Sequence, residues 1–178
     1  MRSRRCCARF TRLTCRVWIG AATAMLLLGG GAAWAGLPLR LDQSEWTAYQ
    51  KVNAAFREQT PKSVARFRYC LSKSTGLDDR AMSKCFGNTA DRELTATENL
   101  SAQLHKFERK TAGPCNSSLT GYQYQLRGWQ SVITGVKRSV HRVGNAATIV
   151  TQARLAELLY PKVAKSAAAF AAACKPKS

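Results

Sequence analysis

The sequence predicts an all-α fold, an up-down-up-down four-helix bundle with kinked helices and two disulfides. Large apolar residues recur at alternating steps of three and four along most of the chain, which places them on one face of a helix. Glycine, asparagine and proline separate these stretches at short turns. Four cysteines lie at equal distances from two of those turns. No stretch alternates at a period of two for long enough to favour a β-strand.

Residues 1–35 differ in composition from the rest of the chain. Six arginines and no acidic residue are followed by an apolar run over residues 17–33 and the small-residue sequence Ala33-Trp34-Ala35. This pattern is typical of a secretory signal peptide, which we expect to be cleaved before Gly36. An uncleaved membrane anchor is the alternative, since a spanning helix needs at least about 17 apolar residues. Residues 36–178 are expected to form one secreted or extracytoplasmic domain.

The first predicted helix starts after Asp42, which forms a capping box with Glu45. Pro61 either kinks this helix or splits it in two. We favour a kink because the apolar spacing keeps its phase across the proline. The predicted inward positions are Trp46, Tyr49, Val52, Phe56, Phe67 and Cys70.

The second predicted helix begins at Asp78, just after Gly76 ends the first, and stops at Gly113-Pro114. Its inward positions are Phe86, Leu94, Leu100, Leu104 and Phe107. In an antiparallel helix pair, residues equidistant from the turn lie at the same height. Cys70 and Cys85 are equidistant from this turn, so we expect them to form a disulfide.

The third and fourth predicted helices meet at a Gly144-Asn145 turn. The third helix has inward positions at Tyr122, Leu126, Trp129, Ile133, Val136, Val140 and Val143. The fourth, with Pro161 as a second kink, has them at Ile149, Ala153, Ala156, Tyr160, Val163, Ala167, Phe170 and Cys174. Cys115 and Cys174 are equidistant from the turn and are predicted to form the second disulfide. The cysteine spacing does not match a metal site.

Positive charge is concentrated in the second half of the chain. The whole sequence has a formal net charge of +18, and residues 109–178 contain 11 basic residues and one acidic residue, Glu157. Residues 36–108 contain 11 basic and 9 acidic residues. Such an excess attracts anionic partners. The predicted binding surface on the third and fourth helices comprises Arg127, Lys137, Arg138, His141, Arg142, Arg154, Lys162 and Lys165.

The leading functional hypothesis is an exported binding module for an anionic envelope polymer or lipid headgroups. Nucleic acid is disfavoured because no nucleic-acid-binding motif occurs and the chain is predicted to be exported. The alternative is a protein-interaction or structural bundle, monomeric or dimeric, that uses Leu158 and Leu159. His105 and His141 lack the carboxylate spacing of a metal or acid-base site, so we expect no metal, cofactor or enzymatic activity. An enzyme with an unrecognised site is the third hypothesis.

Overall fold

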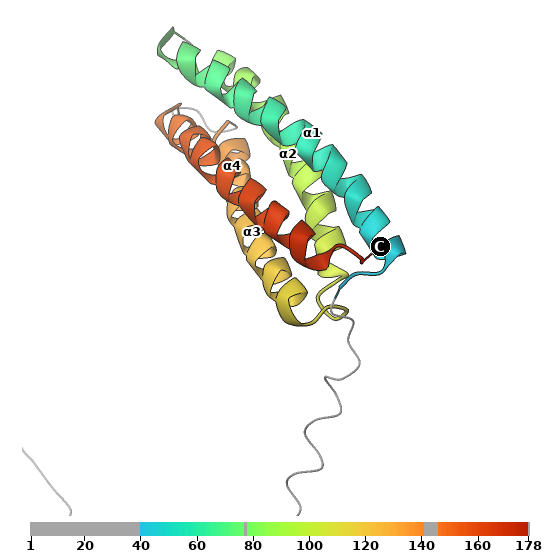
Figure 1. The fold of residues 1–178 in the computed structure, drawn as a ribbon. Helices are drawn as coiled ribbons and strands as arrows, with labels where there is room; N and C mark the ends of the chain where they lie inside the picture. The colour runs from blue at the N-terminus through green and yellow to red at the C-terminus, as the bar shows by residue number, and fades with distance from the viewer. Residues whose placement is uncertain (1–39, 77, 141–145, 178) are drawn as a thin grey trace, which may run out of the picture. The chain divides into compact units, whose positions relative to one another are not determined.

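The computed structural model describes residues 40–76, 78–140 and 146–177, and within these ranges every regular secondary-structure element is a helix. The helices are α1 (Gln43–Lys73), α2 (Asp79–His105), α3 (Gly113–Val140) and α4 (Ala146–Cys174), with a short 3-10 helix, η1 (Ser74–Gly76), after α1 (Figure 1). The predicted signal peptide and the predicted Gly144-Asn145 turn lie outside these ranges. None of the described helices combines the length and hydrophobicity needed to cross a membrane. The predicted all-α fold is confirmed.

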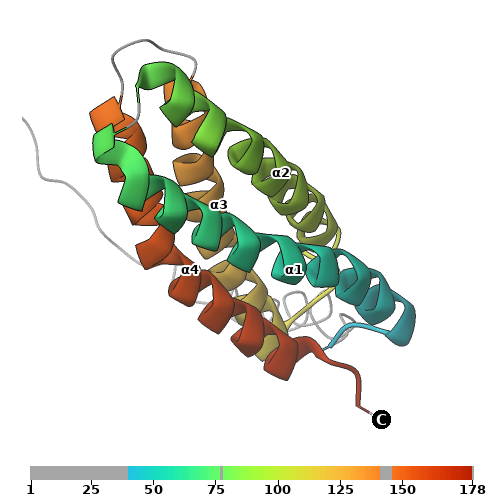
Figure 2. The same ribbon diagram turned by 90° about the horizontal axis from the view of Figure 1, so that it is seen from above.

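The helices pack as two hairpins, α1 with α2 and α3 with α4, joined along α2 and α3 (Figures 1 and 2). Helices α3 and α4 form the closest pair, whereas α1 and α4 make few contacts. The two ends of the domain meet at one end of the bundle. There the Leu41 N–H donates to the Cys174 carbonyl at 3.1 Å, and Arg40 Nη1 donates to the Lys175 carbonyl at 2.9 Å.

The start of α1 has the predicted capping box. The Asp42 carboxylate accepts from the Glu45 N–H at 2.7 Å, and the Glu45 carboxylate accepts from the Asp42 N–H at 3.2 Å. Helix α1 continues through Pro61 without a break, so the alternative of two separate helices is wrong. One long helix therefore extends along the full length of the bundle.

Helix α2 begins as predicted but ends earlier. The Asp78 carboxylate accepts from the Ala81 N–H at 2.7 Å, which caps the helix. The helix stops at His105 rather than at Gly113, because the next N–H groups bond to carbonyls three residues back and tighten the chain into turns. Gly113 has a φ of 58°, a conformation that favours glycine, and Pro114 follows in the first turn of α3.

Both predicted disulfides are confirmed. The sulfur atoms are 2.00 Å apart in Cys70–Cys85 and 2.08 Å apart in Cys115–Cys174. Each bridge joins the two helices of one hairpin, and the two bridges lie at opposite ends of the bundle. Two disulfides in one small domain indicate an oxidising, extracytoplasmic environment.

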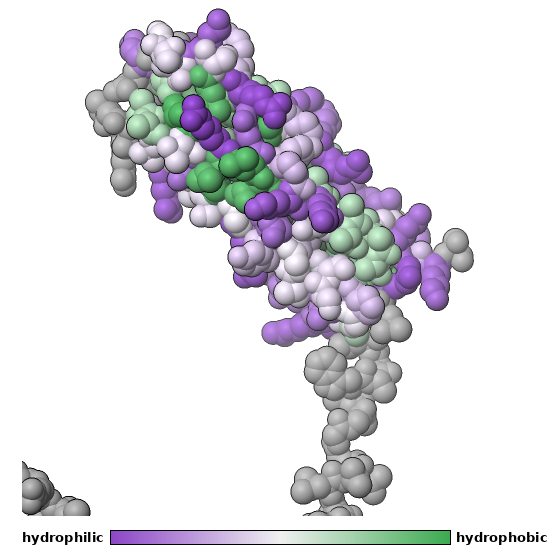
Figure 3. Space-filling model, turned by 60° about the vertical axis from the view of Figure 1, so that its left-hand side comes forward, coloured by the Kyte–Doolittle hydropathy of each residue, from purple (hydrophilic) through white to green (hydrophobic). Residues whose placement is uncertain are grey.

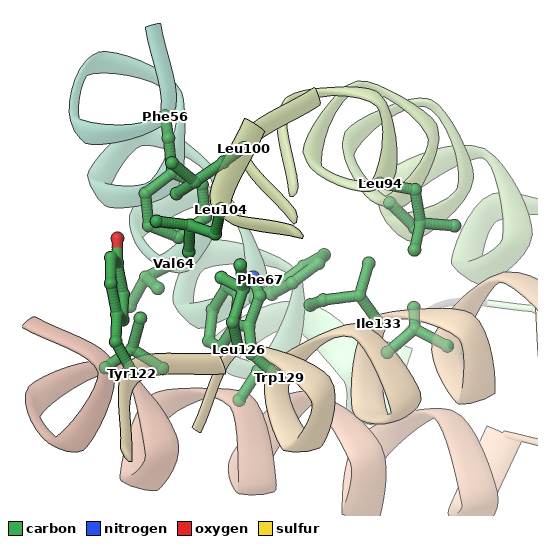
Figure 4. Packing of buried hydrophobic residues seen from close by; sticks show 14 of the residues in the cluster. Phe56, Val64, Phe67, Leu94, Leu100, Leu104, Tyr122, Leu126, Trp129 and Ile133 are labelled. Atoms are coloured by element: carbon green, nitrogen blue, oxygen red, sulfur yellow. The ribbon is translucent and has the colours of Figure 1, made fainter. Parts of the chain in front are cut away.

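The core is built mainly from aromatic and large aliphatic side chains of α1, α2 and α3. Figure 4 shows these converging residues: Phe56, Val64 and Phe67 from α1, Leu94, Leu100 and Leu104 from α2, and Tyr122, Leu126, Trp129 and Ile133 from α3. Helix α4 buries smaller residues, among them Ala153 and Ala156. Tyr160 and Ala167, both predicted to face the core, are only partly buried. The core is therefore thinnest where α4 faces α1.

Candidate functional site

The predicted basic surface on α3 is divided between two sides of the helix. Lys137 extends toward α2, where its Nζ lies 2.8 Å from Asp91 Oδ1. Arg127 and Arg138 border a shallow depression of about 320 Å³ together with Gln130, Ser131 and Thr134. His141 and Arg142 lie outside the described residues. Of the α3 residues, Arg127 and Arg138 are the two that share a surface feature.

The α4 part of the predicted surface consists of Arg154, Lys162 and Lys165, all of them exposed. Among the described residues, no carboxylate forms an ion pair with any of the three. Glu157, the one acidic residue of α4, instead pairs with Arg68 of α1 at 3.0 Å. The α4 cations therefore lack a neutralising carboxylate among the described residues, and none of the three lines the depression that Arg127 and Arg138 border.

A basic groove that the sequence reasoning missed lies between α1 and α2. It has a volume of about 320 Å³ and four basic side chains: Lys62 and Arg66 from α1, and Lys84 and Arg92 from α2. Its other lining residues are Gln59, Ser63, Cys85, Asn88 and Thr89, and they include no carboxylate. We call this feature the α1/α2 groove.

The α1/α2 groove continues into a second depression that shares Arg66, Lys84 and Cys85 with it. Tyr69 and Lys73 extend the lining there. The Arg66 guanidinium lies 4.9 Å from the centre of the half-exposed Tyr69 ring, a distance typical of a cation–π contact. The combined surface thus presents a row of cations and one accessible aromatic ring.

The acidic residues of the first hairpin mostly face away from this groove. Glu93 points into the core, Asp91 pairs across to α3, and Glu45 pairs with Lys110 at 2.6 Å. Glu58 pairs with Lys62 at 2.8 Å and partly offsets the charge of that lysine. A hairpin that is nearly neutral in total therefore has one strongly basic face.

Glu93 is the one buried carboxyl group of the described core, with no exposed surface. Its Oε1 accepts hydrogen bonds from Thr60 Oγ1 at 2.7 Å and from Trp129 Nε1 at 2.9 Å, while its Oε2 has no partner. Burial raises the pKa of Glu93, and the hydrogen bonds from Thr60 and Trp129, together with the nearby Ser63 hydroxyl, oppose that shift. The group links α1, α2 and α3 and is closed off from solvent.

The described residues contain no group of three or more His, Cys, Asp and Glu side chains arranged to hold a metal ion. His105 lies on the surface, with its Nδ1 at 2.6 Å from Glu108 Oε1. Hydrogen bonding to His105 lowers the pKa of Glu108. Both groups are largely solvent-exposed, and neither lines the α1/α2 groove.

Comparison of the chain with protein-family models, with curated proteins and with solved structures finds no match in any of the three. The functional argument therefore rests on the geometry and charge of the bundle itself.

Proposed function

We propose that this protein is a non-catalytic binding module for a linear anionic polymer, which it holds in the α1/α2 groove. The observation that carries the proposal is the groove lining, in which four basic side chains converge without a carboxylate. From Lys62 to Lys73, α1 extends about 16 Å at about 1.5 Å per residue. Cations distributed over that length suit repeated negative charges better than one small anion.

The basic residues of α3 and α4 act as a secondary surface in this proposal. Arg127, Arg138, Arg154, Lys162 and Lys165 attract the polymer over a distance and contact it outside the groove. Long-range attraction of this kind depends on ionic strength, because salt at about 0.15 M screens exposed charges beyond about 8 Å.

The proposed partner is a polymer of the cell envelope. Residues 1–35 have the composition of an export signal, and the two disulfides indicate an oxidising compartment. In this proposal the signal is cleaved and the domain is secreted. Anionic lipid headgroups share the same charge chemistry, so a direct test must include both.

The test is calorimetric titration of the oxidised protein with poly(glycerol phosphate) over a series of salt concentrations. A variant combining Arg66→Gln, Lys84→Gln and Arg92→Gln is expected to bind about 10- to 100-fold more weakly at low salt. The loss of three cation–phosphate contacts should also make the plot of log K against log salt concentration less steep, by about 2 in slope, by analogy with single-stranded nucleic acids.

The matched control removes the same net charge elsewhere, through Lys51→Gln, Lys106→Gln and Arg109→Gln at exposed positions outside the groove. We expect this control to keep the salt slope of the unmodified protein. Equal losses in the two triple variants would show that net charge, not the groove, determines binding. Binding to phosphatidylglycerol vesicles without binding to the polymer would replace the polymer with a membrane surface.

A protein-binding role is a second candidate, supported by apolar exposure on α4. Leu158 is 68% exposed and Leu155, one turn earlier, is 39% exposed, whereas Leu159 is partly buried. Figure 3 shows separate apolar patches bordered by hydrophilic side chains on the face that it brings forward. Sedimentation velocity over a range of concentrations distinguishes a self-associating bundle from a monomer.

A further inference from the structure

A second groove, different in chemistry from the first, lies between α1 and α4. Its volume is about 380 Å³, within the range of about 300–1,000 Å³ that is usual for small-molecule sites. The lining comprises Tyr49, Asn53, Phe56, Arg57 and Pro61 from α1, Tyr122 from α3, and Tyr160, Ala164, Ala167, Ala168 and Ala171 from α4. We call this feature the α1/α4 groove.

The small side chains of α4 create the space. Helices α1 and α4 make few contacts, and α4 lines the groove with four alanines, of which Ala164 and Ala168 are exposed and Ala167 and Ala171 are partly buried. Tyr160 and Ala167 continue the core periodicity of α4 but remain only partly buried, because α1 does not cover them. The groove thus lies at the surface beside the core and is lined by alanines of α4 and by aromatic side chains.

The polar atoms of the groove gather around Tyr49, which is 2% exposed and has a buried hydroxyl without a hydrogen-bond partner. The nearby Tyr122 hydroxyl makes only a long bond to Asn53 Oδ1, at 3.4 Å. In Figure 4 the Tyr122 ring extends from α3 toward α1 and carries its hydroxyl to that side. An unpartnered buried hydroxyl lowers the stability of a fold, so a ligand that accepts from Tyr49 would remove that cost.

Both tyrosines are neutral donors. Burial raises the pKa of Tyr49 to about 12 and raises that of Tyr122 as well. Arg57 lines the groove together with both tyrosines, and its positive charge opposes these shifts. The lining includes no carboxylate. The chemistry of this end of the groove therefore favours a ligand group that accepts hydrogen bonds and carries negative charge.

We propose that the α1/α4 groove binds a small amphiphilic monocarboxylate of medium chain length. The apolar chain lies along the alanine face of α4 and against Phe56 and Tyr160. The carboxylate pairs with Arg57 and, once the side chains that close over the buried Tyr49 hydroxyl shift aside, accepts a hydrogen bond from it. From Ala164 to Ala171 the alanine face extends about 10 Å at about 1.5 Å per residue, which sets the length of chain that fits. This site shares no lining residue with the α1/α2 groove and does not depend on polymer binding.

The probe is octanoate, titrated calorimetrically into the full oxidised protein and compared with octan-1-ol and octylammonium. We expect saturable binding of one octanoate per chain, at least about tenfold tighter than binding of the alcohol or the amine, because charge-assisted hydrogen bonds are the strong ones. Absence of octanoate binding, or equal binding of octan-1-ol, would overturn the proposal.

Variants then locate the site. Tyr49→Phe keeps the ring, loses one hydrogen bond and weakens octanoate binding about three- to tenfold. Arg57→Gln weakens it about tenfold or more, and Ala168→Leu, which fills the groove, abolishes it.

The matched controls are Ala169→Leu and Lys51→Gln, at exposed neighbouring positions outside the groove. Both should bind octanoate like the unmodified protein. Circular dichroism confirms folding of every variant. If Ala168→Leu binds as well as Ala169→Leu does, or if Tyr49→Phe and Arg57→Gln have no effect, octanoate does not occupy this groove.

Discussion

Replacing Glu93 by glutamine should stabilise the bundle at neutral and alkaline pH. The amide keeps the oxygen that accepts from Thr60 and Trp129, and it replaces the unpartnered Oε2 with a neutral donor group close to Ser63. Leaving a buried polar atom unsatisfied costs about 1–3 kcal/mol, and more when the group is charged. We therefore expect Glu93→Gln to raise the free energy of unfolding by about 1–3 kcal/mol at pH 8.

The effect should depend on pH in a defined direction. Burial raises the pKa of Glu93 above its ordinary value of 4.5, so above that pH the folded protein retains a proton that the unfolded chain has lost. The contribution of Glu93 to stability is then fully present below pH 4.5 and is lost as pH rises through the folded-state pKa, by at most about 1.4 kcal/mol per pH unit. The advantage of Glu93→Gln should therefore be small at pH 4 and grow toward pH 8.

Urea unfolding followed by circular dichroism at pH 4 and pH 8 measures this difference. In thermal unfolding, a domain of this size should gain about 3–10 °C at the higher pH. Glu98→Gln, an exposed change on the same helix, is the control and should show no such pH dependence. A difference between Glu93→Gln and the unmodified protein that is constant from pH 4 to pH 8, or a loss of stability at pH 8, would refute the reasoning.

Two further changes test the architecture. Replacing both cysteines of the Cys115–Cys174 bridge by serine should lower the free energy of unfolding by about 4 kcal/mol, because that bridge closes a loop of 59 residues. The same change at Cys70–Cys85, which closes a loop of 15 residues, should lower it by about 3 kcal/mol. Denaturant unfolding measures both losses. Gly128→Ala should raise stability by up to about 1 kcal/mol, since open space surrounds that helical position. Gly135→Ala should stabilise less, because a Cβ there would lie 3.0 Å from Gln152, and thermal unfolding compares the two.

Local spacing was sufficient to predict the helices, the caps and the disulfides. Asp42 and Asp78 cap through atoms only three residues away, and the cysteine pairing follows from symmetry about short turns. The caps and the disulfide pairing depend on the number of residues between the interacting groups within one hairpin. They do not depend on how the two hairpins pack on each other.

The α1/α2 groove was missed because charges were summed over the whole hairpin rather than by helix face. Lys62, Arg66 and Lys73 are separated by four and seven residues, which places them on one side of α1. Lys84 and Arg92, eight residues apart, share a side of α2 in the same way. This spacing is present in the sequence and could have predicted the site.

Glu93 also has a signal that sequence reasoning overlooked. It continues the inward spacing of α2 between Ala90 and Thr97, at steps of three and four residues, and all three side chains are buried. The α1/α4 groove has no comparable signal. The small size of the α4 alanines is visible in the sequence, but the distance between α1 and α4 depends on how the hairpins pack.

The placement of the two disulfides determines how the chain responds to a protease. A cut between Cys70 and Cys85 leaves both fragments covalently joined, and so does a cut anywhere between Cys115 and Cys174. A cut in the connection between them, at residues 106–112, releases two closed hairpins that only non-covalent contacts hold together, among them the Leu41–Cys174 backbone hydrogen bond. On a denaturing, non-reducing gel, one nick between the first and last cysteines of the bundle converts one band into two only if it falls between Cys85 and Cys115, and residues 106–112 are the part of that stretch that lies outside the helices.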